Sequence, residues 1–137
     1  MIEFAVCFLV LFPMFTGAFQ FGYTFFMLNN LETAVRGGAR YASLRKLSNA
    51  GDATVPTAFS DDVKNMVVYG NPSGGSSPIV PNLATSNVNL TIEFANGVPS
   101  TITVSVSGYT INSVFGSMAC NGKPTLTYPY TGIYTPY

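Results

Sequence analysis

The sequence lacks histidine and tryptophan, and it contains little charge. Asp, Glu, Lys and Arg make up 9% of its 137 residues, whereas they form roughly 25% of an ordinary soluble domain. With no histidine and no nucleophile placed beside a base, the chain offers no candidate catalytic constellation, and we expect no enzyme. Six basic residues balance six acidic ones, so the clustered positive charge of a nucleic-acid-binding protein is also missing.

Cysteine is scarce as well. Cys7 lies in an apolar run and Cys120 in a distant polar region, so a bridge between them is geometrically unfavourable. Neither has the spacing of a metal ligand. We therefore expect two unpaired cysteines, no metal and no cofactor.

No Lys or Arg precedes Arg36, and the segment from Phe4 to Leu28 carries no charge at all. As a helix this segment would be about 37 Å long at about 1.5 Å per residue, which exceeds a hydrocarbon core of about 30 Å. The segment predicts a transmembrane helix. A secretory signal peptide fits less well, because no basic residues precede the run and no A-x-A site ends it.

The basic residues Arg36, Arg40, Arg45 and Lys46 all follow the apolar run. By the positive-inside rule they would keep the C-terminal part in the cytoplasm. The Ser-, Thr- and Tyr-rich remainder of the chain is instead typical of an exported surface. A basic leader that is removed after insertion would resolve this conflict.

The helical pattern continues beyond the apolar run in "MLNNLETAVRGGARYASLRK", where Leu28, Leu31 and Val35 recur at intervals of three and four. Glu32 precedes Arg36 by four residues, the favourable order for an ion pair, and Arg40 extends the same polar face. Gly37-Gly38 weakens the helix by roughly 1 kcal/mol per glycine, so we expect outside support or close helix packing there. The helix should end near Leu47.

The residues after position 56 alternate with a period of two. "VNLTIEF" (88–94) and "TITVSVS" (101–107) place apolar side chains on one face, and "ANGVP" between them is a turn signal, which predicts an antiparallel hairpin. Residues 62–70 predict a strand or a short helix, and the Pro- and Tyr-rich end predicts an extended edge or tail.

The predicted fold is therefore α+β, a long N-terminal helix with a small antiparallel β-sheet domain packed on its C-terminal half. We divide the chain into an apolar membrane or filament-core helix (1–28), an amphipathic continuation of that helix (29–48) and an exposed β-rich domain (49–137). The β-rich part is small and needs the helix to cover its core.

The apolar segment contains several residues that a plain membrane anchor does not need. Glu3 either lies among headgroups at the positive helix N-terminus or awaits a positive partner on another subunit. Pro13 is tolerated in membrane helices, but with Gly17 and Gly22 it also suits a helix that kinks or unwinds on repacking. An aromatic stripe at helical spacing faces either lipid or a helix–helix seam; its members are Phe4, Phe8, Phe12, Phe15, Phe19 and Phe26.

The tripeptide Asn89-Leu90-Thr91 is a formal N-glycosylation sequon. Because Asn89 falls in the middle of a predicted strand, we give this candidate site little weight.

Three blocks of the N-terminal region resemble the TadE-like family, the tight-adherence pseudopilins of the type IV pilus superfamily. They are "IEFAV" followed by Pro13, "GAFQFGYTFF", and "AVRGGARYAS". Gln20 stands where the family usually has an acidic residue. The family's glutamate is usually fifth in the mature chain and is third here, so two residues precede the given start or processing differs.

The resemblance implies a precursor whose basic leader is cut by a prepilin peptidase in the inner membrane. It also implies that Glu3 pairs with the free amine of a neighbouring subunit, and that the aromatic seam forms the filament core. The expected assembly residues are Met1, Glu3, Phe4, Phe8, Phe12, Phe15 and Phe19.

On this basis we expect a pilin-like subunit that forms a helical homo-oligomer through bundled N-terminal helices. It would be held in the cytoplasmic membrane before assembly and displayed afterwards on the bacterial cell surface, in contact with the pilus assembly machinery. The alternatives are a minor pseudopilin of a tight-adherence assembly or secretion machine, and a single-pass membrane protein whose β domain binds a partner.

Overall fold

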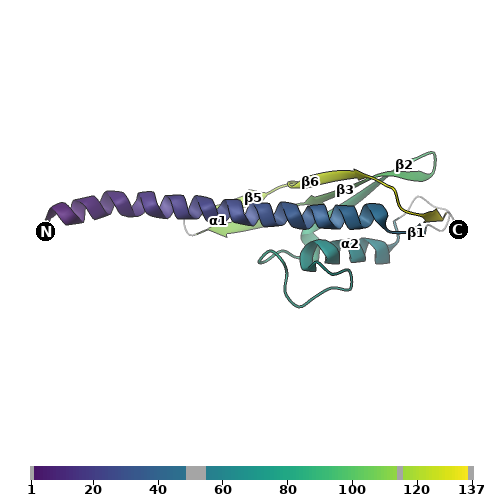
Figure 1. The fold of residues 1–137 in the computed structure, drawn as a ribbon, viewed down its shortest axis with the longest axis horizontal. Helices are drawn as coiled ribbons and strands as arrows, with labels where there is room; N and C mark the ends of the chain where they lie inside the picture. The colour runs from purple at the N-terminus through teal and green to yellow at the C-terminus, as the bar shows by residue number, and fades with distance from the viewer. Residues whose placement is uncertain (1, 49–54, 114–115, 136–137) are drawn as a thin grey trace.

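The computed structural model describes residues 2–48, 55–113 and 116–135. One long helix projects well beyond the rest of the molecule, and a small domain packs on its C-terminal half (Figure 1). This arrangement confirms the predicted α+β fold. The elements in order are α1 (Ile2–Leu44), β1 (Leu47–Ser48), α2 (Thr57–Tyr69), a 3-10 helix η1 (Thr85–Asn87), β2 (Val88–Ala95), β3 (Val98–Val106), β4 (Tyr109–Ser113), β5 (Gly116–Cys120), β6 (Thr125–Pro129) and β7 (Tyr134–Thr135).

Helix α1 changes character along its length. Its buried residues begin at Met27, and Leu31, Val35 and Ala39 further along are fully buried. These positions follow the spacing of three and four that the sequence showed. The C-terminal half of α1 is therefore a core helix of the domain, packed against α2, β3, β4 and β6.

The helix ends at Leu44, three residues earlier than the sequence suggested. Beyond Arg45, whose N–H still bonds the Tyr41 carbonyl, the backbone turns outward. The Leu47 N–H then donates to the Ile133 carbonyl at 3.0 Å, and β1 pairs with β7 in parallel. Pairing with the distant C-terminal segment thus takes the place of the last helical turn.

The segment 62–70, predicted as a strand or a short helix, belongs to helix α2 and its C-cap. Phe59, Val63 and Val67 recur every four residues in α2, and all three are buried. Helix α2 lies beside the C-terminal half of α1 (Figure 1). At the contact, Gly38 of α1 faces Val67 so closely that a Cβ on Gly38 would overlap the valine side chain. The cost of this helical glycine is thus offset by close helix packing.

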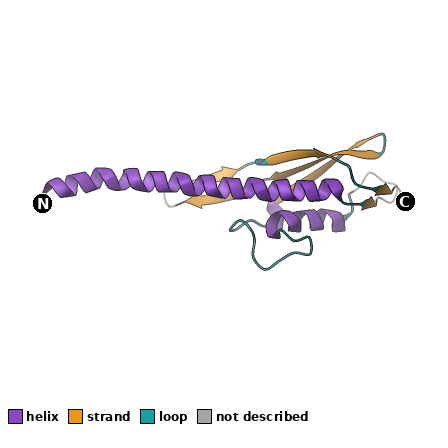
Figure 2. Cartoon of the chain, viewed as in Figure 1, coloured by secondary structure: helices purple, strands orange, loops and turns teal. Residues whose placement is uncertain are grey.

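The main sheet has the order β2-β3-β6, all antiparallel. Its strands are among those drawn in orange in Figure 2. The predicted hairpin is confirmed: Leu90 pairs with Val104 and Ile92 with Ile102. Asn96 and Gly97 form its turn with φ of 54° and 78°, the left-handed pair that a type I′ turn requires. The apolar face of the sheet covers α1, and β6 from the Tyr- and Pro-rich end forms one edge.

A second antiparallel hairpin, β4–β5, was not predicted. It is separate from the main sheet and pairs Tyr109 with Cys120 and Ile111 with Met118. Of all the strands, it extends furthest along α1 toward the N-terminus (Figure 1). Its position brings it beside the boundary between the two halves of α1.

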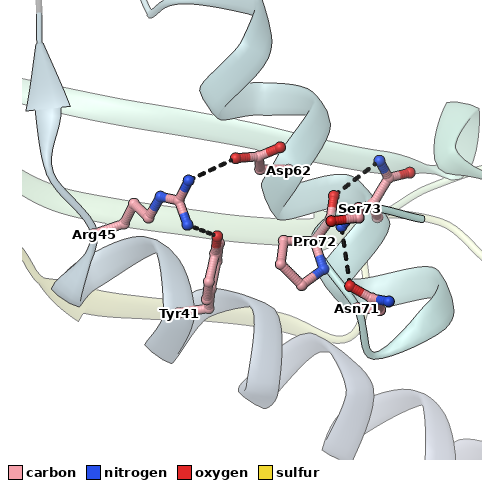
Figure 3. A network of polar contacts seen from close by, with 7 residues as sticks. Tyr41, Arg45, Asp62, Asn71, Pro72 and Ser73 are labelled. Carbon is pink, nitrogen blue, oxygen red and sulfur yellow. Dashed lines mark hydrogen bonds and ion pairs between the residues drawn. The ribbon is translucent and has the colours of Figure 1, made fainter.

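Polar contacts fasten the end of α1 to α2. The Arg45 guanidinium donates to Asp62 of α2 at 3.1 Å and also to the Tyr41 hydroxyl, and it lies 5.3 Å from the centre of the Tyr41 ring (Figure 3). Both ends of the ion pair are partly exposed. A pair of this kind adds at most about 1 kcal/mol, so it orients the two helices more than it stabilises them.

Candidate functional site

The first candidate surface is the N-terminal half of α1, which projects free of the domain (Figure 1). Its large apolar side chains from Ile2 to Phe26 are exposed. By length and composition α1 can cross a membrane, and none of its most apolar window is buried within the protein. An exposed apolar surface of this extent is typical of a site covered by lipid or by another protein.

The aromatic stripe is present on this half-helix. The rings of Phe4 and Phe8 are stacked with centroids 6.5 Å apart, and those of Phe8 and Phe12 are 5.4 Å apart. Phe15 and Phe19 continue the helical spacing and are 76% and 69% exposed. In the part of the chain that the structure describes, the stripe is thus an exposed apolar ridge.

The residues expected to weaken the helix lie within continuous α-helix. Pro13 is inside α1 and does not interrupt it. No described residue lies within 4 Å of a Cβ built on Gly17 or Gly22, so neither glycine is required by packing within this part of the chain. The Thr16 hydroxyl donates to the Phe12 carbonyl at 2.6 Å, which satisfies a polar group that would otherwise face an apolar environment.

Glu3 is exposed in the first turn of α1, on a half-helix with no other charged residue. Its position in the first turn places it at the positive end of the helix dipole. Met1, the other expected partner in assembly, lies outside the described residues. The pairing of Glu3 with a neighbour's amine remains a prediction.

The polar half of α1 contains the expected ion pair. Arg36 donates to Glu32 at 2.8 Å, and both side chains are exposed. Arg40 is exposed too, and within the described parts of the chain it has no ion-pair partner. Asn89 lies on the exposed face of β2 and donates to the Ser107 hydroxyl at 2.5 Å. Glycosylation of Asn89 stays a prediction.

A second candidate surface lies between α1 and the β4–β5 hairpin, where two adjoining hollows form what we call the hairpin groove. The hollow nearer the N-terminus has a volume of about 480 Å³ and the other about 530 Å³. Both are lined mainly by apolar atoms. Phe25 and Leu28 of α1 and Met118 of β5 line both hollows.

Sequence reasoning missed this groove. The ring centroids of Phe21 and Phe25 lie 5.4 Å apart. Their spacing of four residues in the sequence could have indicated a second aromatic pair. The other wall contains Ile111 and Met118, which are register partners in β4–β5. Only the docking of the hairpin against the helix brings the two walls together.

Two buried side chains, Tyr109 and Cys120, lie at the end of the hairpin where β4 begins and β5 ends. The Tyr109 hydroxyl donates to the Pro81 carbonyl at 2.8 Å. Burial, with smaller effects from Cys120 and Tyr23, raises the pKa of Tyr109 above its ordinary value. Burial also raises the pKa of the Cys120 thiol. A neutral, buried thiol is a packing group rather than a nucleophile.

The N-terminal part of the chain matches a known protein family. Residues 1–40 match the TadE-like protein family. The resemblance seen in the sequence is thus confirmed over this segment, which covers the apolar half of α1 and most of its packed half. No curated protein and no solved structure matches the chain.

The TadE-like segment and the exposed apolar helix together fit a membrane-anchored, pilus-associated protein. In the described ranges 2–48, 55–113 and 116–135, no cluster of three His, Cys, Asp or Glu side chains has the geometry to hold a metal ion. The surfaces that stand out are therefore the apolar half-helix and the hairpin groove.

Proposed function

We propose that this chain is a structural, non-catalytic, pilin-like subunit that polymerises into a type IV pilus-related filament. The apolar half of α1 would hold it in the cytoplasmic membrane before assembly. A prepilin peptidase would remove a leader, and the assembly machinery would then transfer the helix from lipid into a bundle of identical helices. The filament would be displayed on the bacterial cell surface.

The observation that carries this proposal is the rigid continuity of α1. A single helix joins a largely exposed apolar half to the packed core of a folded domain. A flexible link would let the domain move independently of its anchor. A continuous helix instead fixes the domain relative to a bundle of apolar helices, as a filament with domains outside and helices inside requires.

Glu3 has a defined part in this scheme. In a bundle without lipid or water, an unpaired carboxylate is strongly destabilising, while a paired one adds little net stability. Pairing with the amine of a neighbouring copy would therefore set the axial register of the subunits. The contact is head-to-tail, and repetition of such a contact generates an open helix.

The test is electron microscopy of filaments sheared from cells, with wild type compared with Glu3→Ala. Glu32→Ala is a matched control, because it removes a carboxylate from the exposed, polar half of the same helix. We expect filaments containing this chain in wild type and in Glu32→Ala, and their loss in Glu3→Ala. Filaments of normal yield in Glu3→Ala would reject the role of Glu3 and leave a pilin.

The match over residues 1–40 also favours a second candidate, a minor pseudopilin of a tight-adherence assembly machine. In that case the chain would be needed for filaments but would not be their main component. Labelling the chain in sheared filaments distinguishes the two roles. Label along the whole length supports the main subunit, label confined to one end supports the minor one, and no labelled filament supports a simple membrane-anchored protein.

A further inference from the structure

The hairpin groove lies at the level where α1 would leave the hydrocarbon core. If Glu3 sits among the headgroups of one leaflet, a core of about 30 Å is crossed by about 20 residues of helix. The core then ends near Gln20–Tyr23. Gln20 and Tyr23 line a small hollow together with Asn112 and Ser113 at the end of β4. The strand ends of the hairpin therefore lie at the boundary of the core.

On both walls of the groove, the charged residues nearest to the apolar segment of α1 lie at the same depth along the helix. On α1 no charged residue occurs between Glu3 and Glu32, and in the sequence none occurs between Glu93 and Lys123. Glu32 and Lys123 both line the hollow further from the N-terminus. From Glu3 to Glu32 the helix rises about 43 Å, which matches the roughly 40–45 Å of a bilayer with its headgroup layers.

The hairpin itself is only partly covered by protein. Gly116 to Ala119 of β5 are all exposed, and Met118 is 50% exposed. Its neighbours across the groove are the apolar side chains of Phe21, Phe25 and Leu28. A half-covered apolar groove with hydroxyl groups at its rim suits the headgroup layer, where apolar and polar contacts are both available.

We propose that the β4–β5 hairpin is a second membrane-contacting element, seated in the headgroup layer of the leaflet on the domain side, with bilayer lipid occupying the hairpin groove. The surface adjoins the exposed apolar face of α1, since Phe25 belongs to both. The inference rests on the membrane anchoring in the proposed function. It adds a fixed depth and orientation of the β-rich domain against the membrane before assembly.

The absence of tryptophan from the sequence allows a clean test. Single tryptophans are introduced into the full chain, which is reconstituted in three kinds of phosphatidylcholine vesicle. The acyl chains carry no bromine, bromines near the headgroup end, or bromines near the methyl end. Met118→Trp reports on the groove, and Ser117→Trp is a second reporter if the first variant does not fold. Phe15→Trp reports on the membrane span. Val98→Trp, 52% exposed beyond the turn of the β2–β3 hairpin, reports on the distant end.

We expect the bromines near the headgroup end to quench Met118→Trp emission, and those near the methyl end to quench Phe15→Trp emission, by roughly half or more, because the two probes lie at these two depths of the bilayer. Neither lipid should change the emission of Val98→Trp. Quenching of Phe15→Trp without quenching of Met118→Trp or Ser117→Trp would overturn the hairpin inference while preserving the anchor. Blue-shifted but unquenched Met118→Trp emission would also overturn it, since a second protein copy would then fill the groove. If Phe15→Trp is not quenched, the membrane anchor fails and the inference fails with it.

Discussion

Gly38 on α1 lies directly against Val67 on α2, with no room for a side chain between them. A Cβ on Gly38 would overlap the Val67 Cγ2 atom and come within 3.6 Å of the Val63 carbonyl oxygen. The neighbouring Gly37 has no atom within 4 Å of the same position. Two adjacent glycines in one helix thus have different physical roles.

We expect Gly38→Ala to lower the free energy of unfolding by about 1–3 kcal/mol, the range for overpacking a closely packed core. The methyl group would push α2 away from α1, because its neighbours there are a branched side chain and the α2 backbone. Chemical denaturation in detergent micelles, followed by circular dichroism, measures the change.

Gly37→Ala is the matched control for Gly38→Ala. It makes the same chemical change one residue earlier, in open space, and should stabilise the helix by up to about 1 kcal/mol. Equal effects of the two substitutions would show that helix propensity, rather than contact with α2, governs this part of α1.

The Tyr130 hydroxyl fastens the C-terminal segment to the end of α1. It accepts a hydrogen bond from the Leu47 N–H at 3.0 Å and lies 2.9 Å from the carbonyl oxygens of Arg45 and Ile133, to either of which it donates. We expect Tyr130→Phe to reduce the free energy of unfolding by about 1 kcal/mol, as for loss of a typical hydrogen bond. Hydrogen exchange should show faster exchange at the Leu47 amide.

Tyr128→Phe provides the comparison for Tyr130→Phe. Tyr128 is half-buried in β6, and its hydroxyl has no hydrogen bond among the described residues. Its loss should leave both the stability and the Leu47 exchange rate nearly unchanged. An equal effect of the two substitutions would remove the special role of the Tyr130 hydroxyl.

The sequence predicted those elements whose own periodicity determines them. The β2–β3 hairpin followed from strict alternation and an Asn-Gly turn, and both halves of α1 followed from the positions of apolar residues. The sequence predicted the end of α1 three residues too late. The backbone of Leu47 pairs with β7, more than 80 residues further along the chain, and therefore does not extend the helix. Such competition between local and distant partners is invisible to a local pattern.

The candidate surfaces divide in the same way. The aromatic stripe is visible in sequence because its members repeat along one helix. The hairpin groove has one wall from α1 and another from β4–β5, and neither wall is unusual alone. The short β4 and β5 contain few apolar residues, so their docking against Phe21 and Phe25 becomes apparent only in the folded chain.

Stability should fall at alkaline pH. Burial raises the pKa of Cys120 above its ordinary 9.0, and burial raises those of Tyr109 and Tyr130 above 10.0. The unfolded chain therefore loses these protons at lower pH than the folded chain, and stability decreases as pH rises. We expect a constant free energy of unfolding up to about pH 8 and a progressive loss above pH 9.

The pH dependence is measured by denaturant titrations at fixed ionic strength. Cys120→Ala should flatten the portion of the curve that starts near pH 9, whatever its effect on stability at neutral pH. Tyr109→Phe should flatten the portion above pH 10. Curves that remain parallel to wild type for both variants would contradict the assignment of these groups.

Pro13 should make the apolar half of α1 easiest to open near its own turn. Proline cannot donate to the Leu9 carbonyl and disfavours a helix interior by about 3 kcal/mol. Pro13→Ala restores that hydrogen bond and should slow amide exchange around Phe12–Gly17 by about tenfold or more in micelles, because local opening becomes less favourable. Val10→Ala trims an exposed side chain of the same half-helix without adding a backbone donor, so its exchange should match wild type.

Unchanged exchange in Pro13→Ala would mean that Pro13 is merely accommodated. Slower exchange together with fewer filaments would mean that unwinding at this turn assists the passage of the helix from lipid into the bundle.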